Sequence, residues 1–161
     1  KYDPMMPKTI EKYCPSLVLC AFSKKTITGN QILKTKYLLK ESLKIAKSAN
    51  IPKSKIVLDP AIGFFRKAGK GFLFTKINSD HVQRDLFILK NLRSIKLDNP
   101  ILVSVSNKSF IGKILKKKNP IDRIYGSIAA ELVAIRNGAN IIRTHNVEKT
   151  KNAMAIAQKL V

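Results

Sequence analysis

The sequence predicts an α/β fold in which four parallel strands alternate with helices. Apolar runs of about four to six residues recur along the chain, as in KIVLD and NIIRT, and such runs are typical of buried parallel strands. The segments between them show helical periodicity over about ten to eighteen residues, which implies right-handed crossovers between parallel strands. With 161 residues, the chain has the length of one domain.

The first part of the chain is predicted to form a helix, a strand and a second helix. The short helix covers Asp3–Cys14 and the first strand covers Ser16–Phe22. The second helix, Gln31–Ser48, is amphipathic and ends before Pro52, since proline disfavours a helical residue before it. Its apolar positions recur at helical spacing, at Leu39, Leu43 and Ala46.

The second strand is predicted at Lys55–Asp59, and a long loop follows it. The loop extends through Asn78, which is too far for a simple connector. We expect Ser79 to cap the next helix, because serine is favoured there and Asp80 lies in the first turn. The apolar residues of its inner face are Val82, Leu86 and Leu89.

The second half of the chain alternates in the same way. Pro100 opens the third strand, and a helix is predicted over Ile121–Asn137, with Gly138 just past its end. The fourth strand, Asn140–Thr144, follows directly, and Asn146 is expected to cap the last helix. The apolar stripes of these two helices are Ile121, Ile124, Ile128, Leu132 and Ile135, and then Ala153, Ile156, Ala157 and Leu160.

The chain is strongly basic, with 31 Lys and Arg against 10 Asp and Glu and a net charge of +21. Nucleic acid is the usual partner of a protein with such an excess of positive charge. The lysines are scattered, however, and are not gathered with aromatic residues, which favours solvated helix faces and no specific nucleic-acid binding. The dense basic runs, Phe65–Lys70 and Lys113–Lys118, each follow a strand-end cluster, where they favour attraction of phosphate.

The cysteines and the hydropathy pattern indicate a cytoplasmic protein. Cys14 and Cys20 lack the spacing of a zinc site or a redox pair, and we expect reduced packing residues. No apolar stretch reaches the ~20 residues that span a bilayer, and no signal-peptide pattern opens the chain. We therefore expect no membrane partner.

Three polar clusters follow apolar runs, and the carboxyl ends of parallel strands meet on one face, so we expect one shared site. In KIVLDPAIGFF, Asp59 can accept paired N–H donors from a flat heterocycle, although an Asp-Pro turn is an equally good explanation. Gly63 allows a backbone to approach closely. Phe64 supplies either an aromatic wall or an ordinary core residue.

The other two clusters carry cations. In SNKS, Lys108 is a phosphate ligand, a Schiff-base lysine, a stacking cation or a solvated lysine. Arg143 and His145 are one residue apart, so on an extended segment they share a face and can together hold a pyrophosphate. Alternatively, the arginine pairs with a surface carboxylate and the histidine fills a turn. His81 has no partner motif, and we expect it on the surface.

The motifs LDPAIGF, SNKSFIG and RTHNV, with DRIYGSIAAELVAIRNGANII between the last two, resemble the dihydropteroate synthase family. Members of that family are pterin-binding (β/α)₈ barrel enzymes of folate synthesis. The resemblance runs from about Asp3 to the C-terminus but corresponds only to the second half of the barrel. Chain length alone favours an open doubly wound sheet. The resemblance implies instead the C-terminal half of a TIM barrel, as one partial domain spanning 1–161.

The resemblance implies roles for the first two clusters. Asp59 would hydrogen-bond the pterin edge beside Gly63. Lys108 would contact both the pterin and the arylamine pocket. Ser109 and Phe64 would line that pocket.

The third cluster is implied to bind the leaving group. Arg143 would stack near the pterin and, with His145, hold pyrophosphate. The implied reaction condenses 6-hydroxymethyl-7,8-dihydropterin pyrophosphate with p-aminobenzoate or a related arylamine, and Mg²⁺ aids the departure of pyrophosphate. Electrostatic stabilisation of this leaving group would carry the rate, and a neutral arylamine needs no strong base.

This sequence departs from the family pattern at four places. Ala61 replaces a glycine, Asn146 replaces an aspartate, and Phe65-Arg66 replaces glycine-lysine. Asn107 replaces an arginine, which removes a cation near the diphosphate. Either nearby lysines such as Lys113 compensate, or the second substrate is another arylamine.

The family's first strands, with the asparagine that binds Mg²⁺, have no counterpart in this sequence. We therefore expect no metal ligand in this chain, an N-terminal half-barrel as its partner, and little or no activity of the chain alone. The resemblance also allows a homodimer. Two other functions stay open, namely a pterin-binding methyltransferase of the same superfamily and a basic nucleic-acid-binding module.

Overall fold

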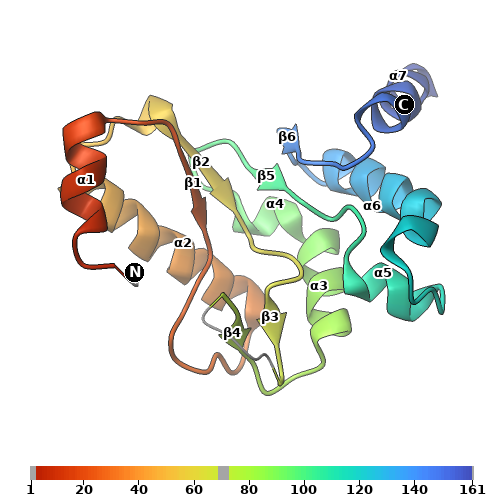
Figure 1. Ribbon diagram of the computed structural model, residues 1–161, viewed down its shortest axis with the longest axis horizontal. Helices are drawn as coiled ribbons and strands as arrows, with labels where there is room; N and C mark the ends of the chain where they lie inside the picture. The colour runs from red at the N-terminus through yellow and green to blue at the C-terminus, as the bar shows by residue number, and fades with distance from the viewer. Residues whose placement is uncertain (1–2, 69–72, 161) are drawn as a thin grey trace.

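The computed structural model describes residues 3–68 and 73–160, in which helices and strands alternate (Figure 1). The elements of the first half are α1 (Met6–Tyr13), β1 (Leu17–Cys20), α2 (Gln31–Ser48), a 3₁₀ turn (Lys53–Lys55), β2 (Ile56–Asp59), β3 (Phe65–Arg66) and β4 (Thr75–Lys76). Those of the second half are α3 (His81–Lys90), α4 (Leu92–Ile95), β5 (Leu102–Val103), α5 (Ser109–Ile114), a 3₁₀ turn (Pro120–Arg123), α6 (Ile124–Arg136), β6 (Ile141–Ile142) and α7 (Val147–Leu160). Among these described elements, none of the helices has the length and apolar character needed to cross a membrane.

Four parallel strands lie side by side in the order β1, β2, β5, β6. β1 and β2 pair along their full lengths, with Cys20 opposite Asp59, and β5 and β6 pair in the same sense. A parallel bridge between Leu58 and Ile101 joins the two pairs. The helices α2, α3 and α6 follow one another beside these strands (Figure 1). The predicted alternation of four parallel strands with helices is confirmed.

The two faces of this sheet differ in burial. Toward the helices, Leu58, Val103 and Val105 are 0% exposed. On the opposite face, Val18 is 52% exposed and Ile141 is 40% exposed. A doubly wound sheet is covered by helices on both faces, whereas part of a barrel leaves its inner face uncovered. The exposure of this apolar face therefore matches half of a barrel.

α2 has the predicted bounds, whereas the predicted cap of α3 is wrong. The side chain of Asp80, not Ser79, accepts the hydrogen bond from the Gln83 amide, at 2.9 Å. A carboxylate suits a helix N-terminus because it also interacts favourably with the helix dipole. On the inner face of α3, Leu89 is buried as predicted, and Val82 and Leu86 pack against the core while partly exposed.

The predicted apolar stripes of the last two long helices are only partly buried. Ile121 is 77% exposed, because it lies in the 3₁₀ turn before α6 and not in the helix itself. Gly138 follows α6 with a φ of +103°, and this predicted helix end is confirmed. Asn146 lies directly before α7, at the position predicted for its cap, and its carbonyl accepts the Thr150 amide at 2.9 Å. Ile156 and Leu160 of α7 are 64% and 80% exposed, because α7 packs mainly on α6.

The predicted long loop after β2 contains structure that the sequence analysis missed. β3 and β4 pair in parallel, with Phe65 opposite Thr75. The basic run that begins at Phe65 ends at residues 69 and 70, which lie outside the described residues. The short helix α5 was also not predicted.

The two cysteines are free, as predicted, but they differ in packing. Cys14 is half-buried and contacts the core, which agrees with a packing role. Cys20 is exposed on the uncovered face of β1, so the prediction that it is a packing residue is wrong for the chain as it stands. Its position follows from strand alternation, because Leu19 and Ala21 face the helices instead.

Leu58→Ala and Val18→Ala distinguish the two faces of the sheet. We expect Leu58→Ala to lower the free energy of unfolding by about 2–5 kcal/mol, because it leaves a cavity in the core. Val18→Ala should cost less than about 1 kcal/mol in the 161-residue chain, because Val18 is already in contact with water. Urea unfolding measures both, and equal losses would contradict an uncovered inner face.

Candidate functional site

The three polar clusters meet at the carboxyl ends of β2, β5 and β6. Asp59 is the last residue of β2. The amide of Arg143 donates to the carbonyl of Val103 at 3.0 Å, and the amide of His145 donates to Oγ of Ser106 at 3.2 Å. The backbone therefore holds the Arg143 segment directly beside the segment that leads to Lys108.

Asp59 is a buried carboxylate between two cations. One of its oxygens, Oδ1, accepts a hydrogen bond from the Ala61 amide at 2.7 Å. Burial raises the pKa of Asp59, while that hydrogen bond and the positive charges of Lys108 and Arg143 oppose the rise. Burial also lowers the pKa of Lys108, and the negative charge of Asp59 opposes that change. The three side chains thus lie within electrostatic reach of one another.

Gly63 makes room for Lys108. The Nζ of Lys108 lies 4.0 Å from the centroid of the Phe64 ring, a cation–π contact. A Cβ at position 63 would lie 2.7 Å from Cδ of Lys108, and the φ of Gly63 is +87°. Both the space and the backbone conformation require glycine here. Gly63, Phe64 and Lys108 are therefore one packed unit.

A buried ion pair on α3 holds this unit and was missed in the sequence. The Gly63 amide donates to both carboxylate oxygens of Asp85, at 3.1 Å each. Nη1 of Arg84 lies 3.1 Å from Oδ1 of Asp85, and both side chains are 0% exposed. Burial raises the pKa of Asp85, and the charge of Arg84 opposes the rise. The sequence did carry a signal for it, because Asp85 lies three residues after Val82 and four before Leu89 and so shares their face of the helix.

Arg84 secures the rest of the same loop. Its guanidinium donates to the carbonyl of Pro60 at 3.1 Å and to Oγ1 of Thr35 at 3.1 Å. It also stacks over the ring of Phe65, with 3.6 Å between its Cζ and the ring centroid. The loop between Asp59 and β3 is thereby fixed on both of its sides.

Arg66 connects this loop to Ser109. Nη2 of Arg66 donates to Oγ of Ser109 at 2.8 Å, and Nη1 lies 3.7 Å from Oδ2 of Asp85. Its Cζ also lies 5.8 Å from the centroid of the Phe74 ring. Ser109, a predicted site residue, is therefore held by Arg66, which the sequence analysis treated as part of a basic run and as a departure from the family pattern.

Arg143 and His145 are both exposed. Their guanidinium and imidazole groups make no hydrogen bond or ion pair within the described residues, which leaves their donors available.

Cys20 lies at the same end of the sheet. Burial raises the pKa of its thiol to about 11, and the charge of Asp59 raises it further. The sulfur is therefore a neutral thiol at pH 7, although part of the residue is exposed.

His81 is half-buried at the start of α3, so the prediction that it lies on the surface is only partly right.

A chain of hydrogen bonds holds the loop that carries Arg143 and His145. The Asn146 amide donates to Oγ1 of Thr144 at 3.1 Å, and that hydroxyl lies 3.1 Å from Oγ1 of Thr150. Thr150 donates to Oε2 of Glu131 at 2.7 Å, and Glu131 is 0% exposed. The loop is thereby tied to α7 and α6.

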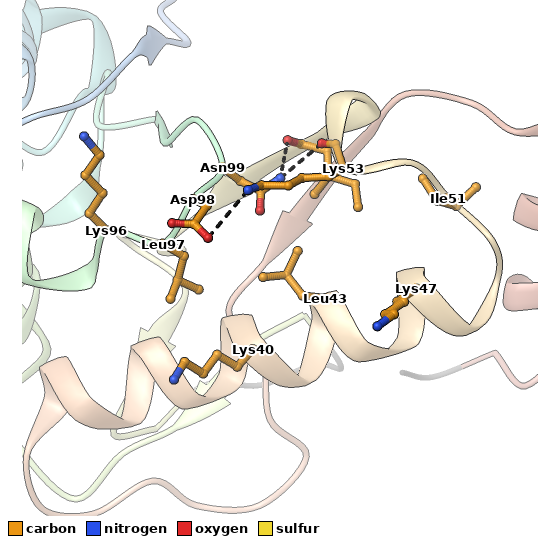
Figure 2. A pocket seen from close by; sticks show the side chains of 10 residues that line it. Lys40, Leu43, Lys47, Ile51, Lys53, Lys96, Leu97, Asp98 and Asn99 are labelled. Atoms are coloured by element: carbon orange, nitrogen blue, oxygen red, sulfur yellow. Dashed lines mark hydrogen bonds and ion pairs between the residues drawn. The ribbon is translucent and has the colours of Figure 1, made fainter.

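A hollow of about 580 Å³ lies at the other end of the sheet (Figure 2). Its lining includes four lysines, among them Lys53, which lies 3.5 Å from Asp98. It borders Ile56, the first residue of β2, and so is remote from Asp59 at the last. None of the predicted site residues lines it.

The described residues do not make a magnesium site. Within residues 3–68 and 73–160, no three His, Cys, Asp or Glu side chains gather as metal ligands. Asp59 and Asp85 each lie between cations and accept backbone N–H groups, which is unlike the oxygen-rich environment that Mg²⁺ prefers.

Comparison with known sequences identifies relatives of this chain. Residues 1–145 match the family described as pterin binding enzyme. A dihydropteroate synthase of Synechocystis is 32% identical over 133 residues, covering 82% of this chain and 41% of the relative. A dihydropteroate synthase of Escherichia coli is 36% identical over 118 residues, covering 73% of this chain and 37% of the relative. The chain thus matches about two fifths of the length of these relatives.

Solved structures share the fold. The dihydropteroate synthase of Clostridium difficile, in the presence of pteroic acid, matches with a TM-score of 0.83 and 30% identity, over 99% of this chain and 56% of that one. That of Coxiella burnetii, in complex with pteroic acid, has a TM-score of 0.80 and 30% identity, over 99% and 57% of the two chains. The half-barrel prediction is confirmed, and the open sheet that chain length favours is wrong.

Gly63→Ala should release Lys108 from Phe64. Gly29→Ala is the matched control, because Gly29 also has a positive φ, of +79°, but has nothing within 4 Å of an added Cβ. Both changes should cost about 1–2 kcal/mol in backbone strain. Only Gly63→Ala should move the pKa of Lys108 up toward its ordinary value of 10.5, because the side chain is pushed into water. Carbon-13 NMR of the lysine Cε atoms measures this pKa, and an unchanged value would contradict the packing described.

Asp59→Asn should stabilise the fold at neutral pH. Because the folded-state pKa of Asp59 lies above 3.8, the folded protein binds this proton more tightly, and stability falls as pH rises through the window above 3.8. The variant avoids this loss. We expect its advantage in urea unfolding to be small at about pH 3.5 and larger at about pH 7. An advantage that does not change with pH would contradict a buried, ionised Asp59.

Proposed function

The chain belongs to the pterin-binding enzyme family, and from that premise we propose that it is the C-terminal half of a dihydropteroate synthase. The observation that carries this proposal is the convergence of Asp59, Lys108 and Arg143 at the carboxyl ends of neighbouring strands. The proposed reaction condenses 6-hydroxymethyl-7,8-dihydropterin pyrophosphate with p-aminobenzoate or a related arylamine. Pteroic acid in the structures of two relatives supports a ligand of this class.

We assign the pterin to Asp59 and Lys108. A pterin presents adjacent N–H donors along its pyrimidine edge, and a carboxylate accepts two such bonds with matching geometry. Oδ1 of Asp59 is already held by the Ala61 amide, which fixes the orientation of the carboxylate. Lys108 lies next to Asp59 and against Phe64, where it can donate to acceptor atoms of the same heterocycle.

We assign the diphosphate to Arg143 and His145, whose donors point into solvent at the open end of the site. In the proposed step, the amine nitrogen of the arylamine attacks the methylene carbon. The C–N bond forms, the C–O bond to pyrophosphate breaks, and the amine loses a proton. The arginine fork stabilises the negative charge that grows on the leaving group. Since the amine is a neutral nucleophile, this assignment requires no strong base.

The rest of the barrel is part of the proposal. The exposed apolar face around Val18 and Ile141 is the surface that an N-terminal half-barrel would cover. We propose that the other half supplies the ligands of any magnesium used in the reaction, since no three His, Cys, Asp or Glu side chains gather among the described residues. We therefore propose that residues 1–161 form one partial barrel domain, little active alone, that works in the cytoplasm. Self-association into a homodimer is compatible with this arrangement.

Lys108→Ala and Arg143→Ala test the assignment. In the completed barrel, each should lower turnover by about 10²–10³-fold, because Arg143→Ala removes charge stabilisation of the leaving group and Lys108→Ala removes a charged donor that positions the pterin. Lys44→Ala is the matched control, because it removes an exposed lysine from α2. Titration calorimetry with a pterin pyrophosphate analogue should show tight binding that Lys108→Ala weakens.

Each alternative has its own signature in this experiment. Retained activity in both variants would favour a methyltransferase of the same superfamily over a synthase. Failure of the completed barrel to bind the pterin would reject the assignment altogether. Binding of nucleic acid that survives ~0.2 M salt would favour the basic module, since purely electrostatic binding largely vanishes there.

A further inference from the structure

A buried glutamate lies beneath the loop of Arg143 and His145, and the proposed step does not use it. Glu131 belongs to α6 and is 0% exposed. One of its oxygens, Oε2, accepts the hydroxyl hydrogen of Thr150 at 2.7 Å. The other, Oε1, is buried and has no hydrogen-bond partner in the part of the chain that the structure describes. A buried carboxylate with so few partners is unfavourable for stability and calls for an explanation.

Stability of the fold does not explain this glutamate. Within the described residues, no cation forms an ion pair with it. Ala134 lies three residues after Glu131 on the same face of α6 and is also 0% exposed, so the position faces the protein interior. Replacing a buried charged group by a packed apolar side chain is often neutral or stabilising. An apolar residue would therefore suit position 131 at least as well.

Glu131 determines the direction of a chain of hydrogen bonds. A carboxylate only accepts, so the hydroxyl of Thr150 donates its one hydrogen to it. The oxygen of Thr150 then accepts from the hydroxyl of Thr144, 3.1 Å away. Thr144 in turn accepts the amide of Asn146, also at 3.1 Å. All the donors of the chain thus point from the loop toward α6, and hydrogen bonds aligned in this way strengthen one another.

Thr144 is the residue through which this chain orients the loop. It stands between Arg143 and His145, which are exposed, while Thr144 itself is half-buried. Neighbouring side chains on an extended backbone point to opposite faces. Because the hydroxyl of Thr144 is fixed toward the interior, the guanidinium and the imidazole on either side of it are held outward, where the diphosphate is assigned.

We propose that Glu131 is a positioning residue for the diphosphate, acting through Thr150 and Thr144 on the loop of Arg143 and His145. This inference rests on the proposed synthase function. Glu131 does not touch the substrate, and its incomplete hydrogen bonding is a loss of stability that the orientation of the loop requires. By charge alone, a carboxylate near the diphosphate would weaken binding of that anion. Removing Glu131 therefore separates positioning from simple electrostatics by the sign of the effect.

Two pairs of variants test the proposal in the completed barrel. Glu131→Leu and Thr144→Val each break the chain. Each should raise the KM for pterin pyrophosphate about fivefold or more, as expected for the loss of one oriented hydrogen bond. Glu131→Gln keeps an acceptor and Thr144→Ser keeps a hydroxyl, so each should retain most of the affinity. The KM for p-aminobenzoate should stay unchanged in all of these variants.

Three further measurements serve as controls. Glu148→Gln is the matched variant, because it removes an exposed carboxylate from the first turn of α7, and it should not raise the KM for pterin pyrophosphate. Combining Glu131→Leu with Thr144→Val should be no worse than the worse single change, because both break one chain. Thermal unfolding of Glu131→Leu should give a melting temperature at or above that of the unmodified barrel.

The outcomes separate positioning from structure and from charge. An unchanged or lower KM for pterin pyrophosphate in Glu131→Leu would overturn the proposal and leave only a charge effect. Equal losses for both substrates with a lower melting temperature would also overturn it and make Glu131 purely structural. If Glu131→Leu does not fold, the KM of Thr144→Val decides by the same criteria. Failure of the unmodified barrel to turn over pterin pyrophosphate rejects the synthase function itself, which no effect confined to a variant can imitate.

Discussion

The carboxylate of Asp85 is the interaction on which the geometry of the site depends. It accepts the Gly63 amide with both oxygens and anchors Arg84, which in turn holds the carbonyl of Pro60. These contacts determine where the loop turns after β2, and so where Phe64 and Lys108 meet. An apolar residue at position 85 would suit the buried face of α3. It would, however, leave the Gly63 amide without a hydrogen-bond partner, which is costly in a buried site.

Two of the three loops that carry the site contain backbone strain, and polar side chains maintain it. Ala61 and Asn107 have φ values of +57° and +59°, a region that residues with a Cβ avoid. Arg84 donates to the carbonyl of Ala61, and Ser127 accepts the amide of Asn107. Such strain concentrates where side chains must be held in one orientation. Its presence at the ends of both β2 and β5 agrees with a function at this edge of the sheet.

The sequence predicted what depends on local periodicity, and it missed what depends on distant partners. The bounds of α2 and the positions of the strand-end clusters follow from the spacing of apolar residues and from where each run stops. The ion pair of Arg84 and Asp85 did not, because nothing in a helical pattern shows that a loop N–H group will be buried against it. Ile121 was misplaced because an apolar residue before a helix has the same spacing as one inside it. Barrel curvature came only from the family resemblance, since strand alternation is the same in open and closed sheets.

The charges of the site fall into two groups with the same imbalance. Asp59 lies between Lys108 and Arg143, and Asp85 lies between Arg84 and Arg66. In each group one carboxylate faces two cations, so each keeps one positive charge, and in each the more exposed cation is an arginine, Arg143 or Arg66. Under the proposed function, the pterin substrate brings an anion, its diphosphate, to the exposed Arg143. A local surplus of charge would bind this anion at one place, which the large but dispersed surface charge of the chain cannot do. The net charge of +21 is therefore a poor guide to function in this protein, and the placement of Arg143 is a better one.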